Sequence, residues 1–214
     1  MQRMARSNFV RSNHEHDSDD EAIMRCSRQV LLGFLFLLTA FRLRADTPLP
    51  PPEFHTVVSR NFDFEADSDP RTNETVVYNR ILHPKGYRTR GEVIWKFPRW
   101  FRAFLLSNDG TAIVAQTDYL NVLPATVATD DYVLLTFIRT GKLIREITVR
   151  QLFGSHPKMR LTMGGNFAWG RVYDLMAPDD LVFVDADSGF FIFEAKTGKC
   201  VFPENNPIDP TTAY

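Results

Sequence analysis

Cysteine is scarce in this chain of 214 residues. The sequence has two cysteines, Cys26 and Cys200, and neither belongs to a Cys-x-x-Cys pair. Structural zinc sites and thioredoxin-like redox sites use such closely spaced pairs, so the sequence carries neither signature. Cys200 lies in a strand-like run, where a small buried hydrophobic residue is the ordinary interpretation.

An excess of basic residues is also lacking. Lys and Arg together number 25 against 26 Asp and Glu, which gives a formal net charge of −1. Proteins that bind nucleic acid usually present a basic surface that neutralises phosphates. The composition therefore argues against a nucleic-acid partner.

Familiar catalytic motifs are absent from the sequence as well. It contains no Gly-x-Ser-x-Gly nucleophile turn, no His-Glu-x-x-His zinc motif and no cofactor fingerprint. Residues 164–170 are rich in glycine, but no Gly-Lys-Ser/Thr follows, as a phosphate loop requires. Residues 185–189 begin like a calcium loop but lack its later bidentate Glu. The sequence predicts no cofactor and no metal, and an enzyme only if a site is assembled in three dimensions.

The N-terminal part of the chain changes abruptly in composition. Residues 1–23 are polar and are expected to form a disordered extension. Residues 24–45 combine a basic start, an apolar run over 30–41 and a small residue, Ala45, which is typical of a secretory signal peptide. Twelve apolar residues make about 18 Å of helix, against a hydrocarbon core of about 30 Å. An uncleaved membrane anchor and a buried core helix are the alternatives.

The rest of the chain divides into three parts by composition. Residues 46–54 are rich in proline and predict an extended linker. Residues 55–202 are expected to form the β domain, and residues 203–214 a flexible tail. With a signal peptide, the protein is exported to the periplasm or the medium. With an uncleaved anchor, it is held on the membrane with the β domain outside the cytoplasm.

Aromatic residues and turn signals predict the fold class. Phe, Trp and Tyr make up 13% of the chain, enough to fill a core between sheets. Asn108-Asp109-Gly110 and Arg139-Thr140-Gly141-Lys142 each separate two apolar runs, as tight hairpin turns do. Around these turns we expect five successive strands, at 92–97, 101–106, 111–116, 132–138 and 143–149.

Flanking segments extend this pattern. Strands are expected at 61–67 and 74–78, a loop at 81–90, and a pair of hairpins over 180–202. Thr148 and Gln151 have the spacing of a capping box, and Gly154 is a stop signal, so one short helix is expected between them.

Two turns of the same sequence give the chain a family resemblance. Thr-Gly-Lys occurs at 140–142 and at 197–199, each between strand-like runs, and Ser107-Asn108-Asp109-Gly110 resembles the blade turn Ser-Pro-Asp-Gly. Residues 91–202 thus resemble the four-stranded blades of WD40-like and quinoprotein-like propellers. The resemblance implies an all-β fold of antiparallel hairpins in blade-like or sandwich-like sheets. Two or three blades cannot close a ring, so the propeller would be incomplete.

A second resemblance is to small exported bacterial proteins with no assigned activity. Their resemblance implies architecture and compartment but no reaction. The matching segments are 100–102, 106–110, 121–124, 141–146 and the Trp169-Gly170 corner with the hairpin after it.

The best interpretation of function is a non-enzymatic binding or interaction module of the cell envelope. We expect the loop 119–128 and the Trp169 corner on one rim, with Trp100, Tyr119, Asn121 and Trp169 as contact candidates. Core packing is the alternative for each tryptophan. The partner would be an unknown protein or envelope component. A structural envelope component, including a homo-oligomer, is the second class, and an enzyme the third.

Overall fold

The computed structural model describes residues 49–154, 159–176, 180–186, 188–203 and 208. The expected N-terminal extension and signal peptide, and most of the expected C-terminal tail, lie outside the described residues. Pro48–Tyr214 forms one compact unit. Among the described residues, none belongs to a helix with the length and apolar character needed to cross a membrane.

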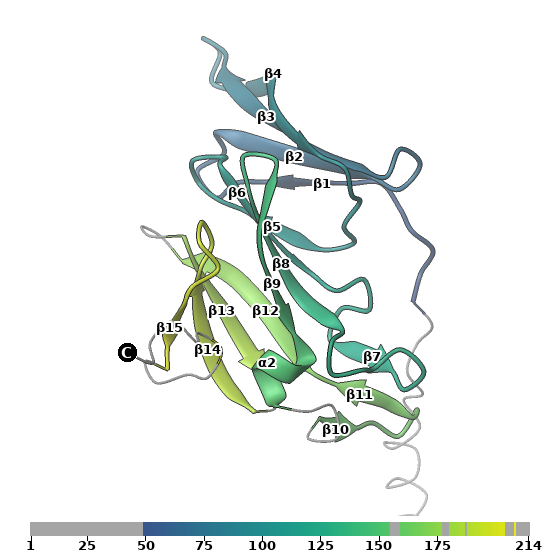
Figure 1. The fold of residues 1–214 in the computed structure, drawn as a ribbon. Coiled ribbons are helices and arrows are strands. Elements are labelled where there is room, and N and C mark those ends of the chain that lie inside the picture. The colour runs from purple at the N-terminus through teal and green to yellow at the C-terminus, as the bar shows by residue number, and fades with distance from the viewer. Residues whose placement is uncertain (1–48, 155–158, 177–179, 187, 204–207, 209–214) are drawn as a thin grey trace, which may run out of the picture. The chain divides into compact units, whose positions relative to one another are not determined.

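The described part of the chain is all-β with antiparallel pairing, as the sequence predicts (Figure 1). Its strands form four sheets, none of which closes on itself. We call them the N-terminal, central, C-terminal and small sheets. Each of the first three sheets has four strands, and neighbouring strands in a sheet follow one another in chain order.

The bounds of these strands are as follows. The N-terminal sheet contains β1 (His55–Val58), β2 (Phe64–Asp69), β3 (Glu74–Leu82) and β4 (Arg88–Phe97). The central sheet contains β5 (Phe104–Leu106), β6 (Ala112–Gln116), β8 (Val133–Arg139) and β9 (Lys142–Thr148). The C-terminal sheet contains β12 (Gly170–Met176), β13 (Leu181–Ala186), β14 (Gly189–Glu194) and β15 (Cys200–Phe202). The small sheet contains β7 (Val122–Pro124), β10 (Arg160–Leu161) and β11 (Asn166–Ala168).

Two expectations about the first half of the domain are wrong. The strand expected at 92–97 is the end of β4, which pairs with β3 and not with the strands that follow it. Half of the loop expected at 81–90 is strand, because β3 continues to Leu82 and β4 begins at Arg88. The turn signals Pro84 and Gly86 therefore mark only the tip of a long hairpin.

The turns predicted at residues 108–110 and 139–142 do form hairpins. Thr140 and Gly141 have φ angles of 45° and 75° between β8 and β9, as a two-residue turn of the twisted hairpin type requires. Gly110, with a φ of 68°, turns the chain between β5 and β6. Both glycines are also close to the N-terminal sheet: a Cβ would lie 2.4 Å from Phe64 at Gly110, and 2.6 Å from the Lys96 carbonyl oxygen at Gly141.

The predicted short helix is present as α2 (Val149–Phe153). The Thr148 hydroxyl accepts a hydrogen bond from the Gln151 backbone N–H, and the Gln151 side chain accepts one from the Thr148 backbone N–H. This reciprocal capping box starts the helix, and Gly154 ends it with a φ of 78°.

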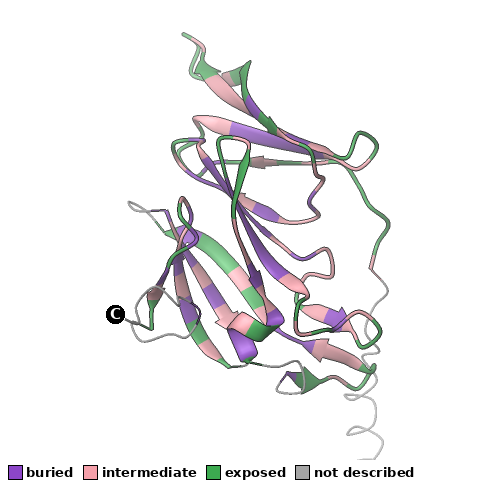
Figure 2. Ribbon diagram, in the orientation of Figure 1, coloured by how far each residue is buried: buried purple, intermediate pink, exposed green. Residues whose placement is uncertain are grey.

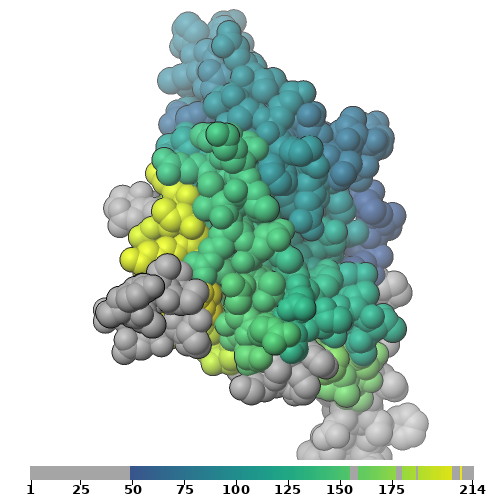
Figure 3. Space-filling view, viewed as in Figure 1, coloured from purple at the N-terminus to yellow at the C-terminus, as the bar shows by residue number. Residues whose placement is uncertain are grey.

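Strands β6 and β8 of the central sheet are buried on both faces, and this explains their nearly continuous apolar sequences. Ile113 and Ile138 face the N-terminal sheet, where they join Trp95 in one core. Val114 and Phe137 face the other way, into a second core with the C-terminal sheet and α2. Figure 3 shows the green surface of the central strands between the blue N-terminal and yellow C-terminal parts. Strand β5 contacts both β1 and β12, so the first strands of the three sheets lie side by side.

Candidate functional site

The structure brings together three of the four contact candidates that the sequence suggested. Strand β7 follows Tyr119 and Asn121 and pairs with β11, which ends just before Trp169. The Trp169 backbone N–H donates to the Asn121 carbonyl oxygen at 3.1 Å. The loop 119–124 and the Trp169 corner are therefore neighbours through backbone contacts.

Trp169 holds this corner from the inside. Its side chain is fully buried in the larger core, and its indole N–H donates to the Leu120 carbonyl oxygen. A buried indole with its one donor satisfied has no surface to offer a partner. Core packing, the alternative interpretation, is what the structure supports for this residue.

Tyr119 and Asn121 differ from Trp169 in exposure. Asn121 is exposed, while Tyr119 is half-buried with its ring centroid 6.2 Å from that of Tyr132. The Tyr132 and Thr117 hydroxyls are hydrogen-bonded at 2.8 Å, and burial raises the pKa of Tyr132 despite that bond. Nearby, Oδ1 of Asp118 is buried without a hydrogen-bond partner among the described residues.

Trp100, the fourth candidate, has a different set of neighbours. Its backbone N–H donates to Asn73 Oδ1 at 2.9 Å, and its indole N–H donates to the Glu53 carbonyl oxygen at 3.2 Å. Arg102 lies 5.3 Å from the Trp100 ring centroid and donates to the Pro51 carbonyl oxygen at 3.4 Å. Trp100 thus holds the end of the proline-rich stretch against the domain.

A junction of turns connects all three large sheets. Asn61, between β1 and β2, donates from Nδ2 to the Asn108 carbonyl oxygen at 2.7 Å. The Asn108 backbone N–H donates to Asp180 Oδ1 at 3.1 Å, and Asp180 is almost fully buried. Lys196 Nζ, between β14 and β15, lies 2.7 Å from Asp109 Oδ2 and 3.6 Å from Asp180 Oδ2. These contacts join turns that are up to 135 residues apart in the chain (61 to 196).

The charges of this junction shift one another's ionisation. Burial alone would raise the pKa of Asp109, but hydrogen bonds from Lys196, Thr111 and Ser107 outweigh it and place the pKa well below its ordinary value. The hydrogen bond to Asp109 raises the pKa of Lys196. Asp109 and Lys196 therefore form an ion pair, which helps to hold the turns of the junction together.

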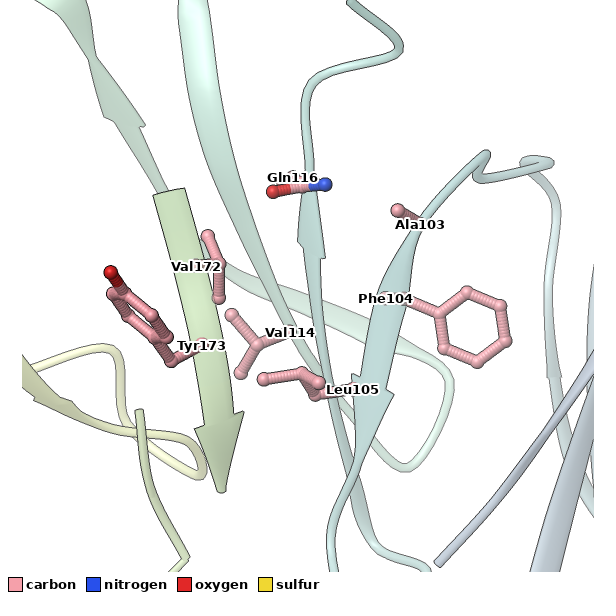
Figure 4. A pocket seen from close by; sticks show the side chains of 7 residues that line it. All are labelled: Ala103, Phe104, Leu105, Val114, Gln116, Val172 and Tyr173. Atoms are coloured by element: carbon pink, nitrogen blue, oxygen red, sulfur yellow. The ribbon is translucent and has the colours of Figure 1, made fainter. Parts of the chain in front are cut away.

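A small pocket opens where β5 and β6 meet β12 (Figure 4). Its volume is about 140 Å³, below the roughly 300–1,000 Å³ of most small-molecule sites. Leu105, Val114 and Val172 make an apolar floor, and Phe104 points away from it. Among the described residues, no group of three or more His, Cys, Asp or Glu side chains could hold a metal ion.

The outer face of the N-terminal sheet, on the side away from the central sheet, carries a network of charges. Glu65 is almost fully buried and forms ion pairs with Arg80, at 3.2 Å, and with Arg90. Arg90 also contacts Asp67 at 2.5 Å and lies 4.3 Å from the Tyr78 ring centroid. Each buried carboxylate on this face therefore has a guanidinium partner.

The outer face of the C-terminal sheet is apolar instead. Cross-strand pairs place Phe183 beside Ile192, and Ile192 beside Phe202. Phe190 lies 6.2 Å from Phe183 between ring centroids and is 55% exposed; Phe202 is 50% exposed. The opposite face of the same strands is buried in the larger core, as Figure 2 shows by the alternating burial along β13 and β14. We call this outer surface the aromatic face; it consists of Tyr173, Leu181, Phe183, Phe190, Ile192 and Phe202.

Sequence reasoning missed the aromatic face, although a signal for it was present. Residues 181–184 and 190–193 are apolar at both strand parities. A strand with one solvated face alternates, so an unbroken apolar run indicates a strand covered on both sides. Here one side is covered by the larger core and the other is the aromatic face.

Comparisons with known proteins give no identity: no family model, no curated protein and no solved structure matches this chain.

Proposed function

We propose that this protein is an exported, non-enzymatic binding module of the cell envelope that takes a protein partner on the aromatic face. The observation that carries the proposal is the exposed apolar surface of the C-terminal sheet, which includes Tyr173, Phe190 and Phe202. Contiguous apolar surface on a soluble domain marks an interaction site more often than a chance exposure. Aromatic side chains are enriched at the centres of protein interfaces.

The strand order also supports the incomplete-propeller architecture that the sequence resemblance implies. Each large sheet is a four-stranded antiparallel meander, and the first strands of the three sheets are neighbours. Blades around a propeller axis are arranged in a similar way, and we propose an incomplete propeller with too few blades to close a ring. In a propeller, the outer face of the last blade would be covered by the next blade.

Export is proposed from the sequence of residues 24–45. Its test is the intact mass and cell fraction of the protein. A chain that begins near Asp46, in a soluble fraction outside the cytoplasm, supports export. A full-length chain in the cytoplasm contradicts it, and a full-length chain in the membrane supports the anchored alternative.

Binding at the aromatic face is tested with a photo-cross-linking residue. The cross-linker replaces Phe190 in one variant and Val93 in a matched control, because Val93 is 48% exposed on β4 of the opposite end sheet. We expect adducts from position 190 only, and their loss when Phe202→Asp is added without a change in melting temperature. Equal adducts from both positions, or none, would contradict the proposal.

A further inference from the structure

The end of the proline-rich stretch, residues 49–54, lies against the domain as a strap ahead of β1. Its three consecutive prolines, at 50–52, have no backbone N–H, so the segment cannot extend β1 as a strand. Two side chains hold its backbone carbonyl groups instead, Trp100 at 3.2 Å and Arg102 at 3.4 Å. The side chains of residues 51–54 are exposed. Hydrogen bonds, and not apolar burial, therefore keep the strap in place.

His55 lies where the strap joins the domain. It is the first residue of β1, and its ring centroid lies 5.2 Å from that of Phe104 on β5. Nε2 of His55 is buried and has no hydrogen-bond partner among the described residues. The hydrogen bond of His55 to the Glu53 backbone therefore uses Nδ1. This is the carbonyl that Trp100 also binds, so a neutral ring protonated on Nδ1 contributes to the docking of the strap.

A second proton on this ring would be unfavourable. It would place a charged N–H at Nε2, where no acceptor is present. Burial lowers the pKa of His55 below its ordinary value of 6.5, and the charge of Arg102 acts in the same direction. The hydrogen bond to Glu53 and the charge of Asp67 on β2 oppose this shift without outweighing it. Asp67 is already paired with Arg90 at 2.5 Å. The docked strap thus favours the neutral form of His55.

We propose that residues 49–54 are a proton-sensitive strap, which neutral His55 keeps docked and protonated His55 releases. Release frees the indole N–H of Trp100 and the guanidinium of Arg102. Trp100, a contact candidate from the sequence, thus becomes fully available only in the released form. Six residues at about 3.4 Å each also add up to roughly 20 Å of reach to the chain ahead of β1. The strap does not involve the aromatic face, so this inference is independent of binding there.

The direction of the pH effect follows from the linkage of proton binding to docking. The released form binds the proton more tightly than the docked form. Above pH 6.5 the ring is neutral in both forms, and docking is at full strength. Docking weakens as the pH falls below 6.5 and stops weakening below the pKa of the docked form. One proton is linked, so the docking equilibrium changes by at most about tenfold per pH unit.

The test is the mobility of a nitroxide label on Glu53→Cys, measured by electron paramagnetic resonance in the full chain. Cys26→Ser removes the other reactive cysteine, since Cys200 is buried. A label on Val93→Cys, at a position exposed on β4, is the matched control. We expect the label at position 53 to be immobile at about pH 7.5 and mobile at about pH 5.5, reversibly. The label at position 93 should not respond.

Three substitutions identify the group that titrates. His55→Phe keeps a ring against Phe104 but cannot bind a proton, so the label should stay immobile over the whole pH range. His83 stacks on Tyr87 in the β3–β4 hairpin, and His83→Phe should leave the acid response as it is. Trp100→Phe removes the indole donor and should release the strap at neutral pH.

A reciprocal measurement does not require a substitution of His55. Titration by nuclear magnetic resonance should give a pKa of His55 below 6.5 in the unsubstituted chain, and Trp100→Phe should return it towards 6.5. A label that is mobile at neutral pH, or immobile throughout, overturns the proposal. So does an acid response that survives His55→Phe in a folded protein. If His55→Phe does not fold, an unchanged pKa of His55 in Trp100→Phe overturns it instead.

Discussion

The N-terminal and C-terminal sheets have the same strand order but opposite outer faces. Both bury one face on the central sheet with alternating apolar residues, such as Val77 in the first and Val184 in the last. On the other face, the first sheet has the ion pairs of Glu65 and Asp67, and the last has Phe183 and Phe190. Stacked repeats need a polar outer face on their terminal units to remain soluble. By that criterion, the N-terminal sheet has the polar outer face of a capping unit, and the C-terminal sheet does not.

The difference shows how the same alternation can serve two purposes. In the N-terminal sheet the outer charged residues pair with one another, so their loss should lower the free energy of unfolding. In the C-terminal sheet the outer residues contribute little to the fold, so their loss should weaken binding of the partner at the aromatic face. Substitutions of the two faces can therefore be compared directly.

The largest effect is expected at Glu65. Glu65→Ala leaves Arg80, whose side chain is only 18% exposed, without its carboxylate partner. We expect a loss of about 2–3 kcal/mol in the free energy of unfolding, below the range for fully buried pairs because Arg90 is half-exposed. Urea unfolding measures it, with Phe190→Ala as the matched change on the aromatic face. If Phe190→Ala costs as much as Glu65→Ala, the division between sealing and binding faces is wrong.

The next effect is expected at the junction that the two end sheets share. Asp180→Ala removes the acceptor of the Asn108 backbone N–H and one partner of Lys196. An unsatisfied buried donor costs about 1–3 kcal/mol, and we expect a destabilisation in that range. Thermal unfolding at neutral pH gives the value, and Asp180→Asn, which keeps an acceptor oxygen, should recover part of it. Equal losses for both variants would mean that the hydrogen bond is unimportant.

A smaller effect is expected from acid. The folded state lowers the pKa of Asp109 below its ordinary value of 3.8, so Asp109 favours folding above that pH and loses this contribution as pH falls through the folded pKa. Stability should therefore fall in acid, and Asp109→Asn should flatten that part of the profile. Denaturant midpoints measured between about pH 5 and about pH 2 at fixed salt test this. An unchanged slope in the variant would show that other carboxylates account for the acid response.

The smallest effect is expected at Arg71. Its side chain is 81% exposed and forms an ion pair with Asp69 in the β2–β3 turn, at the margin of the N-terminal sheet. Exposed pairs gain little because water and salt screen them. Arg71→Ala should leave the melting temperature unchanged. A clear loss of stability would mean that the charge network depends on this turn as well.

The parts of the fold that sequence predicts well are those fixed by local chemistry. Gly110, Gly141 and the Thr148 capping box each depend on residues within a few positions, and all three are present. Strand β12 was missed because a bulge between Val172 and Leu175 disrupts its alternation. Strand β4 was assigned to the wrong sheet because its partner is chosen by packing of Trp95, not by a local signal.

The candidate site was less predictable than the fold. The aromatic chemistry of Trp169 gave no indication of whether the ring faces the core or the solvent, since both environments favour tryptophan. The Glu65 network joins residues up to 25 positions apart, and the turn junction spans far more, so neither leaves a motif in the sequence. The structure shows only that the backbones of Asn121 and Trp169 are neighbours, and a binding rim at Tyr119 and Asn121 stays a prediction.

The burial of β6 and β8 on both faces has a consequence for the register in which these strands pair. Where one face is solvated, a slip of one residue exposes every apolar side chain and is strongly disfavoured. In β6 a slip would only exchange Ile113 and Val114 between two apolar cores, so this safeguard is weak. The close approach of Gly110 to Phe64 and of Gly141 to the Lys96 carbonyl leaves no room for a side chain at a displaced turn. The absence of a Cβ at Gly110 and at Gly141 therefore helps to fix the register of the two hairpins that these glycines turn.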